Sequence, residues 1–251
     1  MRSQRAFWPN LLTVINLFLG FIAILLVLDG RFVAASWMII AAGIIDALDG
    51  KLARIVGSQS EFGMEFDSLA DITSFGIAPA ILLYVAYFNQ LGALGILLAF
   101  FPIMFCGVRL AKYNVTTVLP DEHVEFIGLP TPVQSSAMVS FLIFNYAIWG
   151  TLKLGVFIVP LVILLSYLMI SPIPYDAFPR LSFRGSRSNR MRLIILIMGL
   201  ILVLFKPPVM FFPVVAAYVV IGGVKGLIVM RAREAQELPE LEEIKDDGWI
   251  A

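Results

Sequence analysis

Histidine and cysteine are almost absent from this chain of 251 residues, which has one of each, His123 and Cys106. An internal disulfide framework needs at least two cysteines and is therefore excluded. A single histidine also argues against a metal site built on imidazole ligands, because such sites combine several His or Cys side chains. The chemistry of this chain must be sought in other side chains.

Charged residues are scarce as well, at 14% of the chain, while 60% of the residues are hydrophobic and the mean hydropathy is +0.92. These values lie outside the range of soluble proteins and indicate a membrane protein. The formal net charge is zero, and we expect membrane lipids rather than nucleic acid as partners. The first apolar run lies between Asn10 and Asp29 without a small-residue cleavage site, so it predicts a membrane span rather than a removable signal peptide.

Apolar runs that are long enough, or nearly so, to cross a bilayer recur along the chain, and a span needs about 20 residues. They cover roughly residues 11–28, 33–53, 68–88, 91–112, 132–149, 154–172, 191–205 and 208–229. The pattern predicts an all-α fold, a polytopic transmembrane helical bundle of about eight spans with a six-helix catalytic core.

We expect the whole chain, residues 1–251, to form a single integral membrane domain. A short interfacial segment at residues 1–9 precedes the catalytic core at residues 10–172. A basic loop at residues 173–190, a C-terminal helical hairpin at residues 191–230 and an acidic tail at residues 231–251 complete the chain.

Basic residues set the expected orientation, because the cytoplasmic loops of membrane proteins carry an excess of Lys and Arg. With the N-terminus inside, the outside loops hold only Arg31, Lys153 and Lys206 of the 18 basic residues. Both termini and the turn between the second and third runs are then cytoplasmic. We therefore expect an integral protein of the cell (inner) membrane whose active site opens to the cytoplasm.

Four aspartates flank that turn. Asp46 and Asp49 (i, i+3) share one face of a helix. Asp67 and Asp71 (i, i+4) share a face of the next helix, and residues 55–62 can turn the chain back so that the two faces meet. Hard cations such as Mg²⁺ or Mn²⁺ prefer carboxylate oxygens as ligands. Two such ions on shared carboxylates form a clamp for a phosphate or pyrophosphate, so the pattern predicts chemistry at phosphorus.

The spacing around these aspartates also carries a resemblance. The stretch reads Asp46-x2-Asp49-Gly50-x2-Ala53-Arg54-x8-Gly63-x3-Asp67-x3-Asp71, and it resembles the signature of the CDP-alcohol phosphatidyltransferases at every fixed position. The resemblance implies two divalent ions, Mg²⁺ or Mn²⁺, on the four aspartates, with Asp71 as general base, and it implies a homodimer. It further implies a nucleotide site formed by Asn10, Thr13, Gly50, Ala53, Arg54 and Gly63.

Helix packing is the alternative role for the small and polar residues of this set. Asn10 and Thr13 begin a stripe at helical spacing in the first run, and such a stripe either packs helices or lines a site. At Asn16 and Gly20, one and two turns deeper, we expect packing. The glycines and the alanine of the signature leave the same choice, because a minimal side chain admits either a ligand or a neighbouring helix.

Three further stretches are Phe66-Asp-Ser-Leu-Ala-Asp-Ile-Thr-Ser-Phe-Gly76, Arg109-Leu-Ala-Lys112-Tyr-Asn114 and Phe126-Ile-Gly128-Leu-Pro130-Thr-Pro132. Together they resemble one branch of the family, the bacterial CDP-diacylglycerol–serine phosphatidyltransferases. That branch usually has Arg, Phe and Ser where this chain has Lys112, Tyr113 and Thr131. The resemblance implies CDP-diacylglycerol and L-serine as substrates and phosphatidylserine and CMP as products.

Two basic residues suggest where L-serine, the alcohol that accepts the phosphatidyl group, binds. Arg109 falls about one turn inside its apolar run, deeper than a basic residue that only anchors a span at the membrane surface needs to be. Its guanidinium suits a carboxylate or a phosphate as ligand. Lys112, on the same face, fits an anchor at the cytoplasmic end of the span equally well. For L-serine we expect a site formed by Arg109, Lys112, Asn114, Gly128 and Pro130.

Other functions remain open at this point. The same chemistry could use glycerol 3-phosphate or inositol phosphate as acceptor, although a phosphorylated acceptor calls for more cations than one Arg–Lys pair. A cation or proton transporter could use buried aspartates as relays, but no inverted repeat or pair of broken helices is evident. A non-catalytic membrane scaffold leaves the four aspartates without a role.

Overall fold

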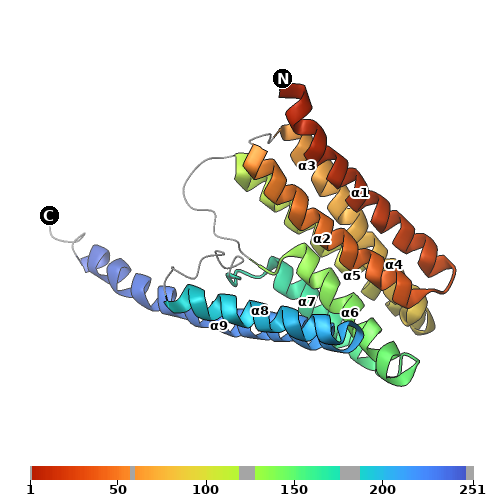
Figure 1. The fold of residues 1–251 in the computed structure, drawn as a ribbon. Coiled ribbons are helices and arrows are strands. Elements are labelled where there is room, and N and C mark those ends of the chain that lie inside the picture. The colour runs from red at the N-terminus through yellow and green to blue at the C-terminus, as the bar shows by residue number, and fades with distance from the viewer. Residues whose placement is uncertain (1, 57–59, 119–127, 176–186, 247–251) are drawn as a thin grey trace.

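The computed structural model describes residues 2–56, 60–118, 128–175 and 187–246, and helices account for nearly all of them (Figure 1). The α-helices are α1 (Arg2–Leu28), α2 (Phe32–Val56), α3 (Glu61–Asp71), α4 (Ala78–Ala86), α5 (Gly92–Val118), α6 (Thr131–Trp149), α7 (Ile158–Ile170), α8 (Arg187–Phe205) and α9 (Pro207–Asp246). Shorter elements are the π-helix η1 (Ile72–Ile77) and the 3₁₀ turns η2 (Phe88–Leu91) and η3 (Gly155–Phe157). The described ranges contain no extended strand, which confirms the prediction of an all-α fold.

The chain is an integral membrane protein. Within the described residues, five helical stretches are long and apolar enough to cross a bilayer, and they are Asn10–Leu28, Phe32–Leu52, Glu61–Ala86, Phe88–Val115 and Pro207–Arg231. The apolar stretch Gly155–Ile170 is shorter. Each apolar run of the sequence coincides with a helix or a helical stretch, while the number of about eight spans stays a prediction.

The stretch from Glu61 to Ala86 is helical throughout but changes its winding at its centre. Ser60 caps the start of α3, where its Oγ accepts a hydrogen bond from the Gly63 amide at 3.0 Å. After Asp71 the winding becomes π-helical over η1, and α4 follows with Pro79 near its first residue. Proline lacks an amide hydrogen and is best tolerated at such a helix start. A π-helical turn therefore separates the aspartates from the apolar half of this span.

Helix α1 lies against both carboxylate-bearing segments, since it contacts α2, α3, η1 and α4. Its closest approach is at Gly20, where a Cβ atom would lie 2.9 Å from the Cα of Ser74 and overlap the Ser74 hydroxyl. The Ser74 Oγ in turn donates a hydrogen bond to the carbonyl oxygen of Asn16 at 2.9 Å. Gly20 thus serves the packing role expected for it and brings α1 directly onto η1.

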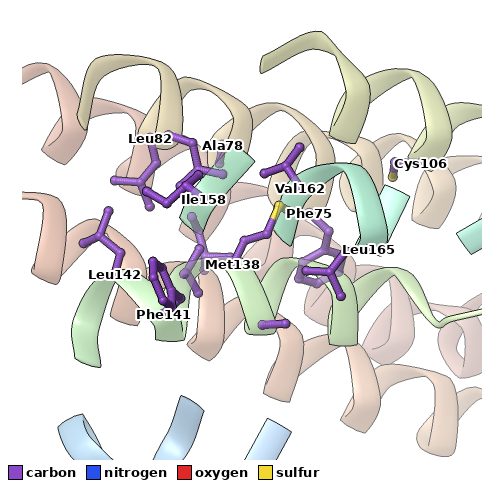
Figure 2. Close-up of a cluster of buried hydrophobic side chains, with 14 of the residues drawn as sticks. Phe75, Ala78, Leu82, Cys106, Met138, Phe141, Leu142, Ile158, Val162 and Leu165 are labelled. Carbon is purple, nitrogen blue, oxygen red and sulfur yellow. The ribbon is translucent and has the colours of Figure 1, made fainter. Parts of the chain in front are cut away.

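Large apolar side chains from η1, α6 and α7 form the core beneath this region (Figure 2). Phe75, Met138, Leu142 and Leu165 have at most 1% of their surface exposed. Cys106 of α5 is also buried. α6 contacts both η1 and α7 within this core.

The C-terminal helices α8 and α9 lie side by side along the edge of the bundle, and the end of α9 projects away from it (Figure 1). α9 packs on α6, where the ring centroids of Phe141 and Phe212 are 5.1 Å apart. The Tyr175 hydroxyl, in the segment after α7, donates a hydrogen bond to the carbonyl oxygen of Val219 at 3.3 Å. α9 continues to Asp246, through most of the stretch expected to form an acidic tail.

Replacement of Gly20 by Ala should destabilise the protein, because the new methyl group would meet the backbone of η1. Overpacking of this kind lowers the free energy of unfolding by about 1–3 kcal/mol. Thermal unfolding of the purified protein in detergent measures the effect. Gly43→Ala is the matched control, since a Cβ there would make ordinary contacts of 3.6 Å or more. Equal stability of the two variants would contradict the close α1–η1 contact.

Candidate metal and substrate site

Three aspartates converge where the end of α2 meets α3. Asp46 and Asp49 come from α2 and Asp67 from α3, and one carboxylate oxygen of each lies within 4.8 Å of the others. Asp49 is 4% exposed, and the other two are half-buried. The helical spacing of the sequence is the reason, because i and i+3 place both α2 carboxylates on the face toward α3.

The three carboxylates fit a hard divalent cation. Among the described residues, the buried Oδ1 of Asp67 has no hydrogen-bond partner. Buried polar atoms are normally satisfied, so an unpartnered carboxylate oxygen in an acidic cluster points to a bound cation. Closely spaced oxygen donors are the ligand set that Mg²⁺ and Mn²⁺ prefer. The cluster is therefore able to hold such an ion.

Helix α1 supplies neutral donors to two of the aspartates. The Thr13 Oγ1 donates to Asp49 Oδ2 at 3.2 Å, and the Asn16 Nδ2 donates to Asp71 Oδ1 at 3.1 Å. Hydrogen bonds of this kind orient carboxylates without neutralising them. Asp71 is buried and lies outside the group of three that converges within 4.8 Å. Asn16, for which the sequence favoured helix packing, thus also contacts one of the four aspartates.

Four of the residues predicted for the nucleotide have side chains or positions that the structure describes, and they are Asn10, Thr13, Gly50 and Gly63. The Asn10 Oδ1 lies 3.6 Å from the place where a Cβ on Gly63 would sit, so the start of α1 and the first turn of α3 are neighbours. Gly50 is exposed, and a Cβ there would meet no atom within 4 Å. Ala53 and Arg54 belong to α2, and their side chains lie outside the described part of the structure.

The polar residues predicted for the acceptor fall into two places. The Arg109 Nη1 donates to Thr131 Oγ1 at 3.0 Å, which joins α5 to the first residue of α6. The Asn114 Nδ2 donates to the Ser68 Oγ of α3 at 3.0 Å. Lys112 is exposed on α5. Helix α5 also contacts η1, which follows directly after Asp71, so Arg109 lies on a helix that borders the segment of this aspartate.

Gly128 and Pro130 shape the backbone that leads into α6. Gly128 has a φ of 83°, and a Cβ there would overlap the carbonyl oxygen of Met169. Its amide donates to the carbonyl oxygen of Ile173 at 3.0 Å, and Pro130 then caps the start of α6. These two residues position Thr131. Thr131 in turn accepts the hydrogen bond from Arg109.

Sequence reasoning missed Gln134, one turn after Thr131 on α6. Both residues have none of their surface exposed. Neither the Nε2 nor the Oε1 of Gln134 has a hydrogen-bond partner among the described residues, and the same holds for the Arg109 Nε. Two polar residues at i and i+3 opening a buried helix were the available signal.

The chain is similar to a known protein family and to several characterised proteins. The sequence pattern of the family described as "CDP-alcohol phosphatidyltransferase" matches residues 6–168. A CDP-diacylglycerol–serine O-phosphatidyltransferase of Helicobacter pylori is 31% identical over 227 residues, which are 89% of this chain and 92% of the relative. An archaetidylserine synthase of Methanothermobacter thermautotrophicus is 37% identical over 187 residues, 71% of this chain and 72% of the relative. A CDP-diacylglycerol–serine O-phosphatidyltransferase of Methanocaldococcus jannaschii is 37% identical over 177 residues, 68% of this chain and 74% of the relative.

Replacement of Asp49 by Asn should weaken Mn²⁺ binding by at least about tenfold, because it removes a charged ligand from the cluster. Titration of the purified protein with Mn²⁺, followed by the electron paramagnetic resonance signal of the free ion, measures the affinity. Asp29→Asn is the matched control, since this exposed aspartate lies at the far end of α1. If Asp49→Asn binds Mn²⁺ as tightly as Asp29→Asn does, the cluster is not the metal site.

Proposed function

Because this chain belongs to the CDP-alcohol phosphatidyltransferase family, we propose that it transfers the phosphatidyl group of CDP-diacylglycerol to the hydroxyl of L-serine, giving phosphatidylserine and CMP. The observation that carries the proposal is the convergence of Asp46, Asp49 and Asp67 within 4.8 Å. The choice of serine is supported by the names of the relatives, since those of Helicobacter pylori and Methanocaldococcus jannaschii are CDP-diacylglycerol–serine O-phosphatidyltransferases.

In this proposal the aspartates bind the pyrophosphate of CDP-diacylglycerol through metal ions. Asp46, Asp49 and Asp67 would hold the metal ions together with Asp71, which follows Asp67 on the same face of the helix. Two divalent ions, Mg²⁺ or Mn²⁺, bound there would offset the charge of the pyrophosphate and stabilise CMP as leaving group. Thr13 keeps Asp49 oriented through its hydrogen bond.

The nucleotide occupies the turn around the start of α3. In support, the space beside the exposed Gly50 is open, and the Asn10 side chain lies beside Gly63. A glycine allows the ligand to approach the helix backbone closely. The proposed pocket consists of Asn10, Thr13, Gly50, Ala53, Arg54 and Gly63.

L-Serine attacks the phosphorus that carries the diacylglycerol. Its hydroxyl oxygen forms the new P–O bond while the P–O bond to CMP breaks, and Asp71 accepts the hydroxyl proton. The hydrogen bond from Asn16 holds one oxygen of Asp71, which leaves the other for the proton. Arg109 binds the serine carboxylate, and Lys112, Asn114, Gly128 and Pro130 complete the acceptor site.

The proposal also covers the setting of the enzyme. About eight spans place the aspartates at the cytoplasmic side of the cell (inner) membrane, with both termini inside, in accord with the distribution of basic residues. The core at residues 10–172 carries the reaction and the hairpin at residues 191–230 packs beside it. A homodimer is the proposed assembly.

Release of CMP from CDP-diacylglycerol tests the function. The purified protein with Mg²⁺ or Mn²⁺ should release CMP only when L-serine is present, and EDTA should abolish the release. Asp71→Asn should lower turnover by at least about 100-fold, because an amide cannot accept the proton, although its oxygen can still accept the hydrogen bond from Asn16. Asp29→Asn serves as control and should retain activity.

Two outcomes would contradict the proposal. Release with glycerol 3-phosphate but not with L-serine would keep the chemistry of the aspartates and discard serine as the acceptor. Near-normal turnover of Asp71→Asn would remove Asp71 from the role of general base.

A further inference from the structure

Gln134 is a buried polar side chain that the reaction described so far does not use. It has none of its surface exposed, yet both its Nε2 and its Oε1 lack a hydrogen-bond partner among the described residues. A buried amide that is unpaired at both ends is unfavourable, and it requires an explanation such as a bound ligand or water.

The neighbours of Gln134 indicate which ligand. Thr131 lies one turn before it on the same side of α6, a separation of about 5–6 Å between the Cβ atoms. Thr131 accepts a hydrogen bond from the Arg109 Nη1 at 3.0 Å. The Arg109 Nε is the third buried atom in this neighbourhood without a described partner. One N–H of the cationic Arg109 side chain and both ends of the Gln134 amide therefore lack a described partner.

This donor and acceptor set matches a free amino acid. The guanidinium suits a carboxylate, and the carbonyl oxygen of an amide accepts a hydrogen bond from an ammonium group. Both α5, which carries Arg109, and α6, which carries Gln134, contact η1, and η1 follows directly after Asp71. Arg109 is partly exposed, and its hydrogen bond to Thr131 joins it to the first turn of the helix that carries Gln134.

We propose that Gln134 is a substrate-binding residue that accepts a hydrogen bond from the α-ammonium group of the acceptor, while Arg109 binds its carboxylate. The inference rests on the proposed function and adds to it the reason for selecting an amino acid. Glycerol 3-phosphate and inositol phosphate lack an ammonium group, so they would leave the amide oxygen unpaired. A site built to pair such a group rejects ligands that lack it.

The test is the Gln134→Leu variant, which removes both polar atoms and keeps most of the side-chain volume. The KM for L-serine should rise about 10- to 100-fold, the range expected for loss of one hydrogen bond to a charged group. The KM for CDP-diacylglycerol should stay the same. For 3-hydroxypropionate, which is serine without the ammonium group, the wild type and the variant should give equal KM values.

Thermal unfolding without substrate supplies a second readout. Removal of an unpaired buried amide should leave the melting temperature unchanged or raise it. A merely structural amide, paired with water, would lower the melting temperature of Gln134→Leu instead. Ser140→Ala is the matched control, because the Ser140 hydroxyl on the same helix is buried but already donates to the Ala137 carbonyl oxygen at 3.2 Å, so its serine KM should not change.

The outcomes separate this inference from the proposed function. Serine-dependent CMP release by the wild type, together with an unchanged serine KM in Gln134→Leu, would overturn the role of Gln134 alone. A lowered melting temperature with an equal rise in both substrate KM values would assign Gln134 a structural role and overturn it as well. If the wild type releases no CMP with L-serine, the proposed function fails and the inference fails with it.

Discussion

Mutual repulsion among carboxylates held close together is the constraint on which this structure depends. Like charges at such distances repel strongly where water is scarce, and acidic groups within a membrane protein are costly. The fold holds Asp46, Asp49 and Asp67 within 4.8 Å of one another nonetheless. The Thr13 hydroxyl orients Asp49 but carries no charge that could offset it. A bound cation would stabilise an arrangement of this kind, and the cluster is able to hold one.

Helix α1 is the element that makes the arrangement possible. Its contact with η1 at Gly20 is so close that the two backbones nearly touch, and this contact brings Asn16 to Asp71. The π-helical winding of η1 follows directly after Asp71. Such turns are frequent at functional sites, because they re-aim side chains within an otherwise regular helix. The packing of one span and the winding of another thus position the same carboxylate.

Helical periodicity made much of this predictable from the sequence. Apolar runs identify the helices, and the spacings of Asp46 with Asp49 and of Asp67 with Asp71 identify the faces that carry the aspartates. The π-helical turn was not predictable, because nothing in Ile72–Ile77 distinguishes it from a regular helix in sequence. The hydrogen bonds of Thr13, Asn16 and Thr131 depend on the relative rotation of neighbouring helices, which periodicity leaves undetermined. For the same reason the sequence did not single out Gln134, since its significance lies in the partners that it lacks.

The most direct test of the central claim is whether a metal ion at the aspartates touches the phosphates of the substrate. Electron–nuclear double resonance on the Mn²⁺-loaded protein with CDP-diacylglycerol measures the coupling between Mn²⁺ and ³¹P. The account predicts a phosphorus coupling of the strength found for a directly coordinated phosphate, and its loss in Asp49→Asn. Bound Mn²⁺ without any ³¹P coupling, or a coupling that persists in Asp49→Asn, would contradict it.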